Sequence, residues 1–250
     1  MKVWKKLYTY YAGLIFGITF LILFPIFLII ISKKSWHRFG YHLNKFWAKA
    51  FFAGIAKPVE VEVHPVINKD NNYVFCPNHF SYLDIPVMGF TPANFVFVGK
   101  SSIKKAPLFG YMFDKLHIAV DRQSKISSYE TYKKSSVVAR HGRSLVIFPE
   151  GGILSKKPPQ MARFKDGAFR IAIEQQIPII PVTIPFNWIV LPENGDFTLK
   201  RGKLKIVFHE PIETAGKKLE DLQSLKDRTF EVINDHLKKH VNNAGRQGNT

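Results

Sequence analysis

The sequence predicts an α/β fold in which a mixed sheet is covered by helices and preceded by an N-terminal apolar helical membrane anchor. Two observations lead to this prediction. An apolar run occupies most of the first 31 residues, and from Pro58 onward short β-prone runs alternate with helical ones. Such alternation is typical of an α/β sheet with covering helices. A chain of 250 residues is long enough for one such domain and an attached anchor.

The N-terminal segment has the length and composition of a membrane helix. No residue from Leu7 to Ile31 is charged, and a bilayer-spanning helix needs about 20 apolar residues. Basic residues flank it at both ends, so the charge pattern fits either topology. It lacks a small-residue cleavage site, which argues against a cleaved signal peptide. A buried core helix is the alternative, but the length of the run and the internal Pro25 argue against it.

A second segment, residues 39–56, mixes aromatic side chains with His42, Lys45 and Lys49. Aromatic residues beside lysines suit a helix in the membrane interface. We therefore expect residues 1–56 to form one of two structures. They form either a helical hairpin anchored from one face, with Pro25 bending its first helix, or one spanning helix followed by an interfacial one.

The α/β domain is expected to occupy residues 57–241, and the small polar residues 242–250 are expected to form a disordered tail. The β-prone runs predict strands at residues 59–63, 73–76, 94–98, 116–120, 145–148, 179–184 and 204–208. The helical runs predict helices at residues 85–89, 108–114, 128–141, 166–175 and 219–241.

The charge and cysteine content narrow the classes of function. A net charge of +17 favours a polyanionic partner. Because nucleic-acid-binding proteins seldom carry an apolar N-terminal segment, we interpret the basic surface as facing the anionic headgroups of a lipid bilayer and expect no nucleic-acid partner. The single cysteine, Cys76, excludes an internal disulfide and a cysteine-based zinc cluster. We expect Cys76 to be an apolar strand residue, since no cation adjacent in sequence would stabilise a thiolate.

The residues most suggestive of chemistry are Asn78 to Asp84, directly after the predicted strand at 73–76. A neutral imidazole can take a proton from an alcohol when a carboxylate fixes its tautomer. Positions five apart do not share a helical face. Pro86, however, prefers a first helical turn, which would place Asp84 at the helix start and His79 in the loop before it. The alternative is a surface-loop histidine beside a helix-capping aspartate. A covalent route through Ser81 is disfavoured, because no G-x-S-x-G elbow surrounds it.

A second polar group, Phe148-Pro149-Glu150-Gly151-Gly152, ends the predicted strand at 145–148. Its glycines allow a close approach of the backbone to a ligand, and Glu150 has a side chain able to hydrogen-bond a polar substrate. The alternative is a turn with a solvent-facing glutamate. Arg122, Lys100 and Lys165 add cations near the ends of strands or the start of a helix, and strand ends are where α/β proteins tend to bind ligands.

These residues, in this order, resemble four motif blocks of the lysophosphatidic acid acyltransferase family, the 1-acylglycerol-3-phosphate acyltransferases of phospholipid synthesis. The N-H-x-x-x-x-D block is Asn78 to Asp84, and the F-P-E-G block is Phe148 to Gly151. A block that ends in an arginine after a strand resembles Ile118 to Arg122, and a proline-centred strand resembles Ile180 to Ile184. The resemblance covers residues 73–188 in order, together with the N-terminal anchor.

The resemblance implies a glycerolipid acyltransferase fold with His79 as general base and Asp84 as its partner. The hydroxyl of a lysolipid acceptor would attack an acyl thioester, supplied by acyl carrier protein or coenzyme A, without an acyl-enzyme, a bound cofactor or a metal. The residues expected to contact substrate are Asn78, Ser81, Lys100, Arg122, Glu150, Gly151, Gly152 and Lys165. The protein would act at the cytoplasmic face of the inner cell membrane, with the acyl chain in an apolar groove near the anchor.

One departure from the family bears on the acceptor. The third block usually continues Thr-Arg-Ser, whereas this chain has Gly152-Ile153-Leu154-Ser155. Losing that arginine should weaken the binding of a phosphate unless another cation compensates, and Lys156, Lys157 and Arg163 lie near in sequence. The leading hypothesis is acylation of lysophosphatidic acid to phosphatidic acid, and a phosphate-free lyso-aminolipid is the alternative acceptor. A non-catalytic membrane- or nucleic-acid-binding protein is a distant third, because charge alone does not explain the motifs.

Overall fold

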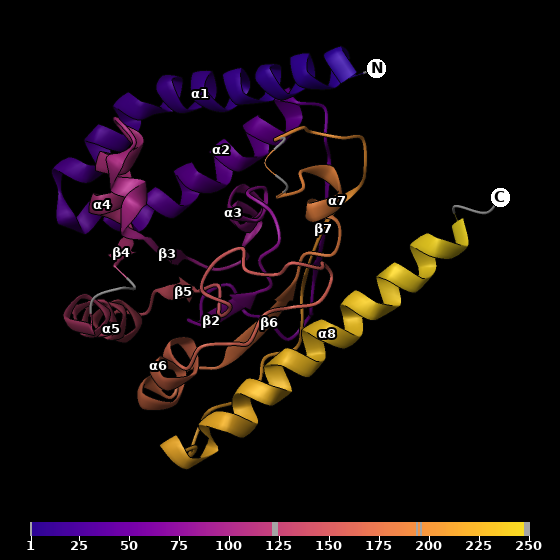
Figure 1. Cartoon of the computed structure of the whole chain (residues 1–250). Helices are drawn as coiled ribbons and strands as arrows, with labels where there is room; N and C mark the ends of the chain where they lie inside the picture. Colours follow the sequence, from indigo (N-terminus) through magenta and orange to yellow (C-terminus); the bar gives the residue numbers. More distant parts are fainter. Residues whose placement is uncertain (1, 122–124, 194, 196, 248–250) are drawn as a thin grey trace.

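The protein is built on a seven-stranded sheet with the strand order β1-β7-β6-β2-β5-β3-β4, which has helices on both faces (Figure 1). The computed structural model describes residues 2–121, 125–193, 195 and 197–247. The strands are β1 (Val59–Val63), β2 (Val74–Pro77), β3 (Phe95–Lys100), β4 (Ile118–Val120), β5 (Ser144–Val146), β6 (Ile179–Thr183) and β7 (Leu204–Phe208). Neighbouring strands run parallel except β6 and β7, which are antiparallel. The predicted mixed α/β sheet is confirmed.

The N-terminal segment is an antiparallel pair of helices. It consists of α1 (Lys2–Ser32), the 3₁₀ segment η1 (Lys34–Phe39) and α2 (Gly40–Gly54). The hydroxyl of Tyr8, near the start of α1, donates to the carbonyl of Ile55 just after α2, at 2.6 Å. The indole of Trp47 donates to the hydroxyl of Thr19 at 2.9 Å. The two helices are paired, as in the first of the two arrangements expected for residues 1–56, the helical hairpin.

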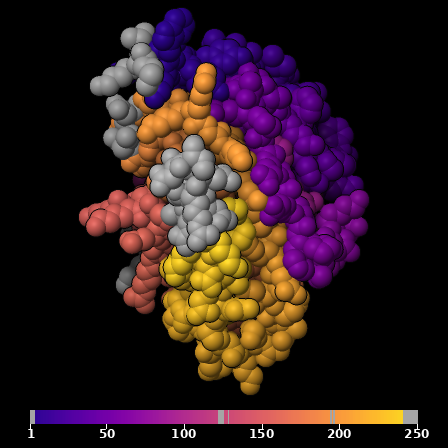
Figure 2. Space-filling model, turned by 90° about the vertical axis from the view of Figure 1, so that its right-hand side faces the viewer, coloured from indigo at the N-terminus to yellow at the C-terminus, as the bar shows by residue number. Residues whose placement is uncertain are grey.

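The outer face of α1 remains apolar and exposed, and its exposed side chains include Leu14, Ile18, Leu21, Ile22, Ile26 and Ile29. Among the described residues, α1 is the one helix that is long and apolar enough to cross a membrane, by length and composition only. Figure 2 shows the N-terminal helices (indigo and purple) at one end of the molecule and the beginning of the C-terminal helix at the other.

The remaining helices connect and cover the strands. They are α3 (Asp84–Val87), η2 (Met88–Phe90), η3 (Ser101–Lys105), α4 (Phe109–Leu116), α5 (Lys125–Arg140), α6 (Gly167–Gln175), α7 (Asn187–Val190), η4 (Leu219–Asp221) and α8 (Leu222–Gln247). The helix α8 continues beyond its expected end at Val241, so residues 242–247 of the predicted tail are helical. Adding residues to an existing helix is much easier than nucleating one, even where the residues are weak helix formers.

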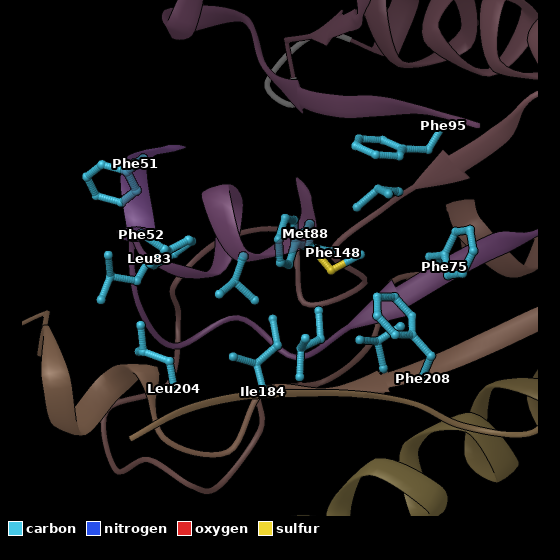
Figure 3. Close-up of a cluster of buried hydrophobic side chains, with 14 of the residues drawn as sticks. Phe51, Phe52, Phe75, Leu83, Met88, Phe95, Phe148, Ile184, Leu204 and Phe208 are labelled. Atoms are coloured by element: carbon cyan, nitrogen blue, oxygen red, sulfur yellow. The ribbon is translucent and has the colours of Figure 1, made fainter. Parts of the chain in front are cut away.

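Two hydrophobic layers hold these elements together. Figure 3 shows the layer between the sheet and the N-terminal helices, where Phe52 of α2 lies in the same cluster as Leu83 and Met88 and the sheet residues Phe75 and Phe208. A second layer packs α5, α6 and α8 against the other face. Fully burying a side chain such as Phe52 contributes about 1.5–3 kcal/mol. The N-terminal hairpin therefore shares its core with the α/β domain.

The parallel pairing of β2 with β5 sets the position of the site. Phe75 of β2 is in register with Val146 of β5. His79 and Glu150 each lie four residues beyond this pair, so they leave the sheet side by side at its carboxyl edge. The strands β3 and β4 run parallel to β5 and end at the same edge.

Candidate active site

His79 and Asp84 are in contact, which is one of the two arrangements that the sequence left open. The imidazole Nδ1 of His79 lies 3.1 Å from Oδ2 of Asp84, and the same oxygen accepts the backbone N–H groups of Phe80 at 2.7 Å and Ser81 at 2.8 Å. Asp84 begins α3, and Pro86 lies in its first turn as expected. An ionised carboxylate only accepts hydrogen bonds, so it holds the imidazole proton on Nδ1. The other ring nitrogen, Nε2, is left able to take a proton.

Phe148 holds the imidazole from a second direction. Its ring stacks on that of His79 with a centroid separation of 4.1 Å and an interplanar angle of 27°. Stacking and the Asp84 contact together restrict the rotation of the ring. The role of Phe148 was not predicted, because it depends on the neighbouring positions of β2 and β5, whose order in the sheet is not encoded in either motif.

Glu150 accepts hydrogen bonds from two backbone N–H groups. Its Oε1 accepts the N–H of His79 and its Oε2 accepts the N–H of Ala162, both at 2.7 Å. The side chain is fully buried. Burial raises the pKa of Glu150 to about 7, against the lowering effect of the two N–H groups, and the charge of Asp84 adds to the rise. Both oxygens of Glu150 are engaged by backbone N–H groups, which gives this side chain a positioning role, and its expected contact with substrate stays a prediction.

Asn78 and Ser81 are also occupied within the protein. The side-chain amide of Asn78 donates to the carbonyl of Ile184 at 3.1 Å, and its oxygen accepts the N–H of Ile184 at 2.7 Å. The hydroxyl of Ser81 donates to the carbonyl of Leu191 at 2.7 Å. Both side chains are fully buried. Asn78 and Ser81 therefore tie the His79 loop to the chain that follows β6, and their expected contact with substrate stays a prediction.

The two side chains considered as covalent nucleophiles are poorly suited to that role. Ser81 donates its proton to the Leu191 carbonyl, and no hydrogen bond joins it to a basic side chain in the described part of the chain. Cys76 is fully buried in β2, and burial raises the pKa of its thiol. Because the thiolate is the reactive form, Cys76 is an inert apolar strand residue, as expected.

Gly151 and Lys165 meet directly. Gly151 has a φ of +86°, a backbone conformation that favours glycine. A Cβ atom at this position would lie 2.7 Å from Nζ of Lys165. The backbone N–H of Lys165 also donates to the carbonyl of Pro149 at 2.8 Å. The fold therefore brings Lys165 to the Phe148–Gly151 turn, while Gly152 continues that turn with a φ of +156°.

The other predicted cations make no such contact with the motif residues among the described residues. Lys100 is exposed and ends β3, opposite Val120 of β4 in the register, so it lies at the same sheet edge as His79. No hydrogen bond or ion pair joins Lys100 to His79 or Asp84 among the described residues. Arg122 falls outside the described residues. Of the cations near the altered third block, Lys156, Lys157 and Arg163 are all exposed.

Comparison with known proteins shows the family of this chain. The family model described as Acyltransferase matches residues 58–185, about half of the chain. This chain belongs to the acyltransferase family. The matched region begins where the α/β domain was expected to begin and contains all four motif blocks.

Several named relatives are similar to this acyltransferase. One is the chloroplastic 1-acyl-sn-glycerol-3-phosphate acyltransferase BAT2 of Brassica napus, 24% identical over 74% of this chain and 53% of the relative. Another is the putative 1-acyl-sn-glycerol-3-phosphate acyltransferase acl-2 of Caenorhabditis elegans, 31% identical over 71% of this chain and 64% of the relative. The acyltransferase thus spans between about half and two thirds of the length of these relatives.

A solved structure shares the fold. The acyltransferase resembles the crystal structure of the 1-acyl-sn-glycerophosphate (LPA) acyltransferase PlsC from Thermotoga maritima, with a TM-score of 0.77. The match covers 95% of this chain and 96% of that chain at 23% identity. The likeness therefore includes the N-terminal helices as well as the α/β domain.

An apolar cavity adjoins the His79 loop of the acyltransferase. It has a volume of about 480 Å³ and lies between the N-terminal hairpin and the α/β domain. Its walls include Phe16 of α1, Trp47 of α2 and Met112 of α4. Tyr82 and Leu83, from the segment between His79 and Asp84, also line it. An apolar space is thus present between the N-terminal hairpin and the segment that joins His79 to Asp84.

Proposed function

We propose that this acyltransferase transfers a fatty acyl chain from an acyl thioester to the free hydroxyl of lysophosphatidic acid, giving phosphatidic acid. The observation that carries the proposal is the His79–Asp84 contact, which leaves Nε2 of His79 able to accept a proton at the carboxyl edge of the sheet. The names of the relatives, 1-acyl-sn-glycerol-3-phosphate acyltransferases, support this acceptor.

In the proposed mechanism, Nε2 of His79 removes the proton of the acceptor hydroxyl while its oxygen attacks the carbonyl carbon of the thioester. Asp84 stabilises the imidazolium that forms. The tetrahedral intermediate then collapses, the carbon–sulfur bond breaks, and His79 returns its proton to the leaving thiolate. No residue is acylated in this sequence, which agrees with the buried states of Ser81 and Cys76. The donor is either acyl carrier protein or coenzyme A thioester.

The acyl chain of the donor is proposed to occupy the 480 Å³ cavity. Each methylene group of the acyl chain that is buried in this apolar cavity would contribute about 0.8 kcal/mol to binding. Because α1 forms a wall of this cavity and carries an exposed apolar outer face, the cavity would lie close to the bilayer.

Anchorage from one face of the membrane is proposed for the hairpin. α1 runs along α2 and is tied to it at both Tyr8 and Trp47, so a spanning orientation would carry α2 and its shared core into the bilayer. The flanking lysines would contact anionic headgroups. We place the catalytic domain at the cytoplasmic face, where acyl thioesters are available.

A second candidate acceptor is a phosphate-free lyso-aminolipid, favoured by Gly152 and Ile153 in place of the usual threonine and arginine. Purified full-length protein should be given lysophosphatidic acid and such a lysolipid side by side, with acyl carrier protein and coenzyme A thioesters as donors and His79→Ala as the blank. Preference for lysophosphatidic acid is the expected result. Preference for the phosphate-free lipid would replace the proposed acceptor, and full activity of His79→Ala would refute the mechanism.

A further inference from the structure

A second pocket, of about 250 Å³, lies where α5 and α6 meet the ends of β4 and β5. Phe148, whose ring stacks on His79, forms part of its wall. Gly151 and Lys165 line it as well. The pocket therefore adjoins the proposed base and is separate from the apolar cavity, with which it shares no lining residue.

Lys165 supplies a positive charge to this pocket. Its ammonium lies over Gly151, and it makes no ion pair with any described residue. The bond from its N–H to the Pro149 carbonyl holds the backbone of this exposed lysine at the turn, and its charge stays available. Such a cation is a suitable partner for a phosphate oxygen.

The N-terminus of α6 also faces the pocket, through Gly167 and Ala168. The first N–H groups of a helix have no intrahelical acceptor and favour an anion. Asp166 stands at the capping position, but its carboxylate makes no capping bond to α6. It instead accepts from Nζ of Lys226 at 2.8 Å. Lys226 thus offsets the charge of Asp166 and leaves the helix terminus without a side-chain cap.

Ser135 provides an independent observation that points to a ligand in this pocket. It lies on α5, lines the pocket and is fully buried. Its hydroxyl has no hydrogen-bond partner among the described residues. A buried hydroxyl without a partner costs about 1–3 kcal/mol, so such groups commonly mark a bound ligand or water. A ligand oxygen in the pocket would satisfy it.

We propose that this pocket binds the phosphate monoester of the acceptor, and that Lys165, the α6 N-terminus and Ser135 replace the arginine absent from the third block. This inference rests on the proposed function, because it assigns the headgroup of the same acceptor. A phosphate monoester offers several strong acceptor oxygens, and the pocket supplies an ammonium, backbone N–H groups and a hydroxyl as donors. Its position beside Phe148 would hold the acceptor near His79.

The first test is kinetic and uses the purified full-length protein. We expect Lys165→Gln to raise KM for lysophosphatidic acid by about tenfold or more, Lys165→Arg to recover most of this loss, and Ser135→Ala to raise KM severalfold. The KM for the acyl donor should stay unchanged. Since coenzyme A and the carrier-protein prosthetic group also carry phosphate, a rise in donor KM alone would assign the pocket to the donor and overturn the proposal.

Matched controls are available on the same helix. Ser136 is also buried and its hydroxyl also lacks a described partner, but it does not line the pocket. Lys134 is an exposed lysine beside Ser135. Ser136→Ala and Lys134→Gln should leave acceptor KM unchanged. Equal effects of Ser135→Ala and Ser136→Ala would mean that general destabilisation is responsible, and would overturn the assignment.

A binding measurement separates this inference from the proposed function. Glycerol 3-phosphate, titrated calorimetrically into the full-length protein, should bind the wild type and Ser136→Ala but bind Lys165→Gln at least about tenfold more weakly. If the wild type fails to acylate lysophosphatidic acid but shows this binding pattern, the proposed function fails and the phosphate site stands. If it acylates lysophosphatidic acid and every variant binds equally, the function stands and the site is refuted.

Discussion

The backbone N–H of His79 donates a 2.7 Å hydrogen bond to Oε1 of Glu150, which links the ends of two neighbouring parallel strands. The other carboxylate oxygen holds Ala162, on the segment that leads to Lys165. The buried side chain of Glu150 thereby connects the loop of His79, the proposed base, to the segment that leads to Lys165, which we propose binds the phosphate. The first and third motif blocks act as a single structural unit.

Replacing Glu150 by glutamine should lower kcat by about tenfold or more, with smaller changes in both KM values. A glutamine side chain has one acceptor oxygen, so either the His79 or the Ala162 N–H loses its partner, at a cost of about 1–3 kcal/mol. Steady-state kinetics and circular dichroism should be measured together. Wild-type kcat in a folded Glu150→Gln protein would contradict the positioning role.

Asp84→Asn should reduce kcat by at least about 100-fold, because general base catalysis typically contributes a rate factor of this size and Asp84 orients the base. An asparagine no longer requires the imidazole proton on Nδ1, and it cannot stabilise an imidazolium by charge. The loss should appear in kcat and in kcat/KM alike, because the interaction acts in the transition state. Because Asp84 also accepts two backbone N–H groups, thermal unfolding must accompany the assay. A folded Asp84→Asn enzyme with near-normal kcat would exclude the pair as the catalytic base.

Gly151→Ala should displace Lys165 and raise KM for lysophosphatidic acid. The added Cβ would meet the lysine side chain at 2.7 Å, in a backbone conformation with a φ of +86°. Gly142→Ala is the matched control, because Gly142 also has a positive φ, +72°, but a Cβ there meets nothing within 4 Å. Both variants should lose about 1–2 kcal/mol of unfolding free energy, yet acceptor KM should rise only in Gly151→Ala. Equal KM values in the two variants would disprove the link to Lys165.

Gly13→Leu should shift donor preference toward shorter acyl chains. Gly13 lines the apolar cavity, and a Cβ at this position meets nothing within 4 Å, so a leucine can extend into the space proposed for the chain. Gly17→Leu is the control, since a Cβ at Gly17 is equally unhindered but Gly17 does not line the cavity. Each excluded methylene should cost about 0.8 kcal/mol of binding. Rates with a series of acyl-coenzyme A donors provide the measurement, and an unchanged chain-length profile in Gly13→Leu would place the acyl chain elsewhere.

The protein should lose stability as the pH falls from about 6.5 to 4. Burial lowers the pKa of His117 to about 3 and the pKa values of His209 and His236 to about 4, with neighbouring cations and histidines adding to the effect. Below pH 6.5 the unfolded chain therefore binds protons that the folded protein does not, and each such group lowers stability by up to about 1.4 kcal/mol per pH unit.

Glu150 works in the opposite direction, because its raised pKa of about 7 makes the folded protein bind the extra proton. Chemical denaturation of the wild type and His209→Gln across this pH range isolates the histidine contribution. The variant should show a shallower decline at low pH. Parallel curves for the two proteins would mean that His209 stays protonatable in the fold.

The sequence by itself determined the fold class and the long apolar N-terminal helix, and it gave the pairing of His79 with Asp84 as one of two possible arrangements. Each depends on residues close together in the chain: an uninterrupted apolar run, alternating strands and helices, and a proline that starts a helix at Asp84. Lys165 was also expected near substrate, but its contact with Gly151 is a feature of the tertiary structure. The F-P-E-G motif drew attention to Glu150 without revealing its partners.

Only the tertiary structure decided that Glu150, Asn78 and Ser81 hold the His79 loop in place through hydrogen bonds to the backbone. It also decided that Ser135 lines a second pocket. These roles depend on which strands are neighbours and which buried groups find partners. Glu150 holds His79 because β2 lies beside β5 with Phe75 opposite Val146. Strand order is set by packing of the whole chain, so a side chain's hydrogen-bond partner across the sheet cannot be derived from the residues adjacent to it in sequence.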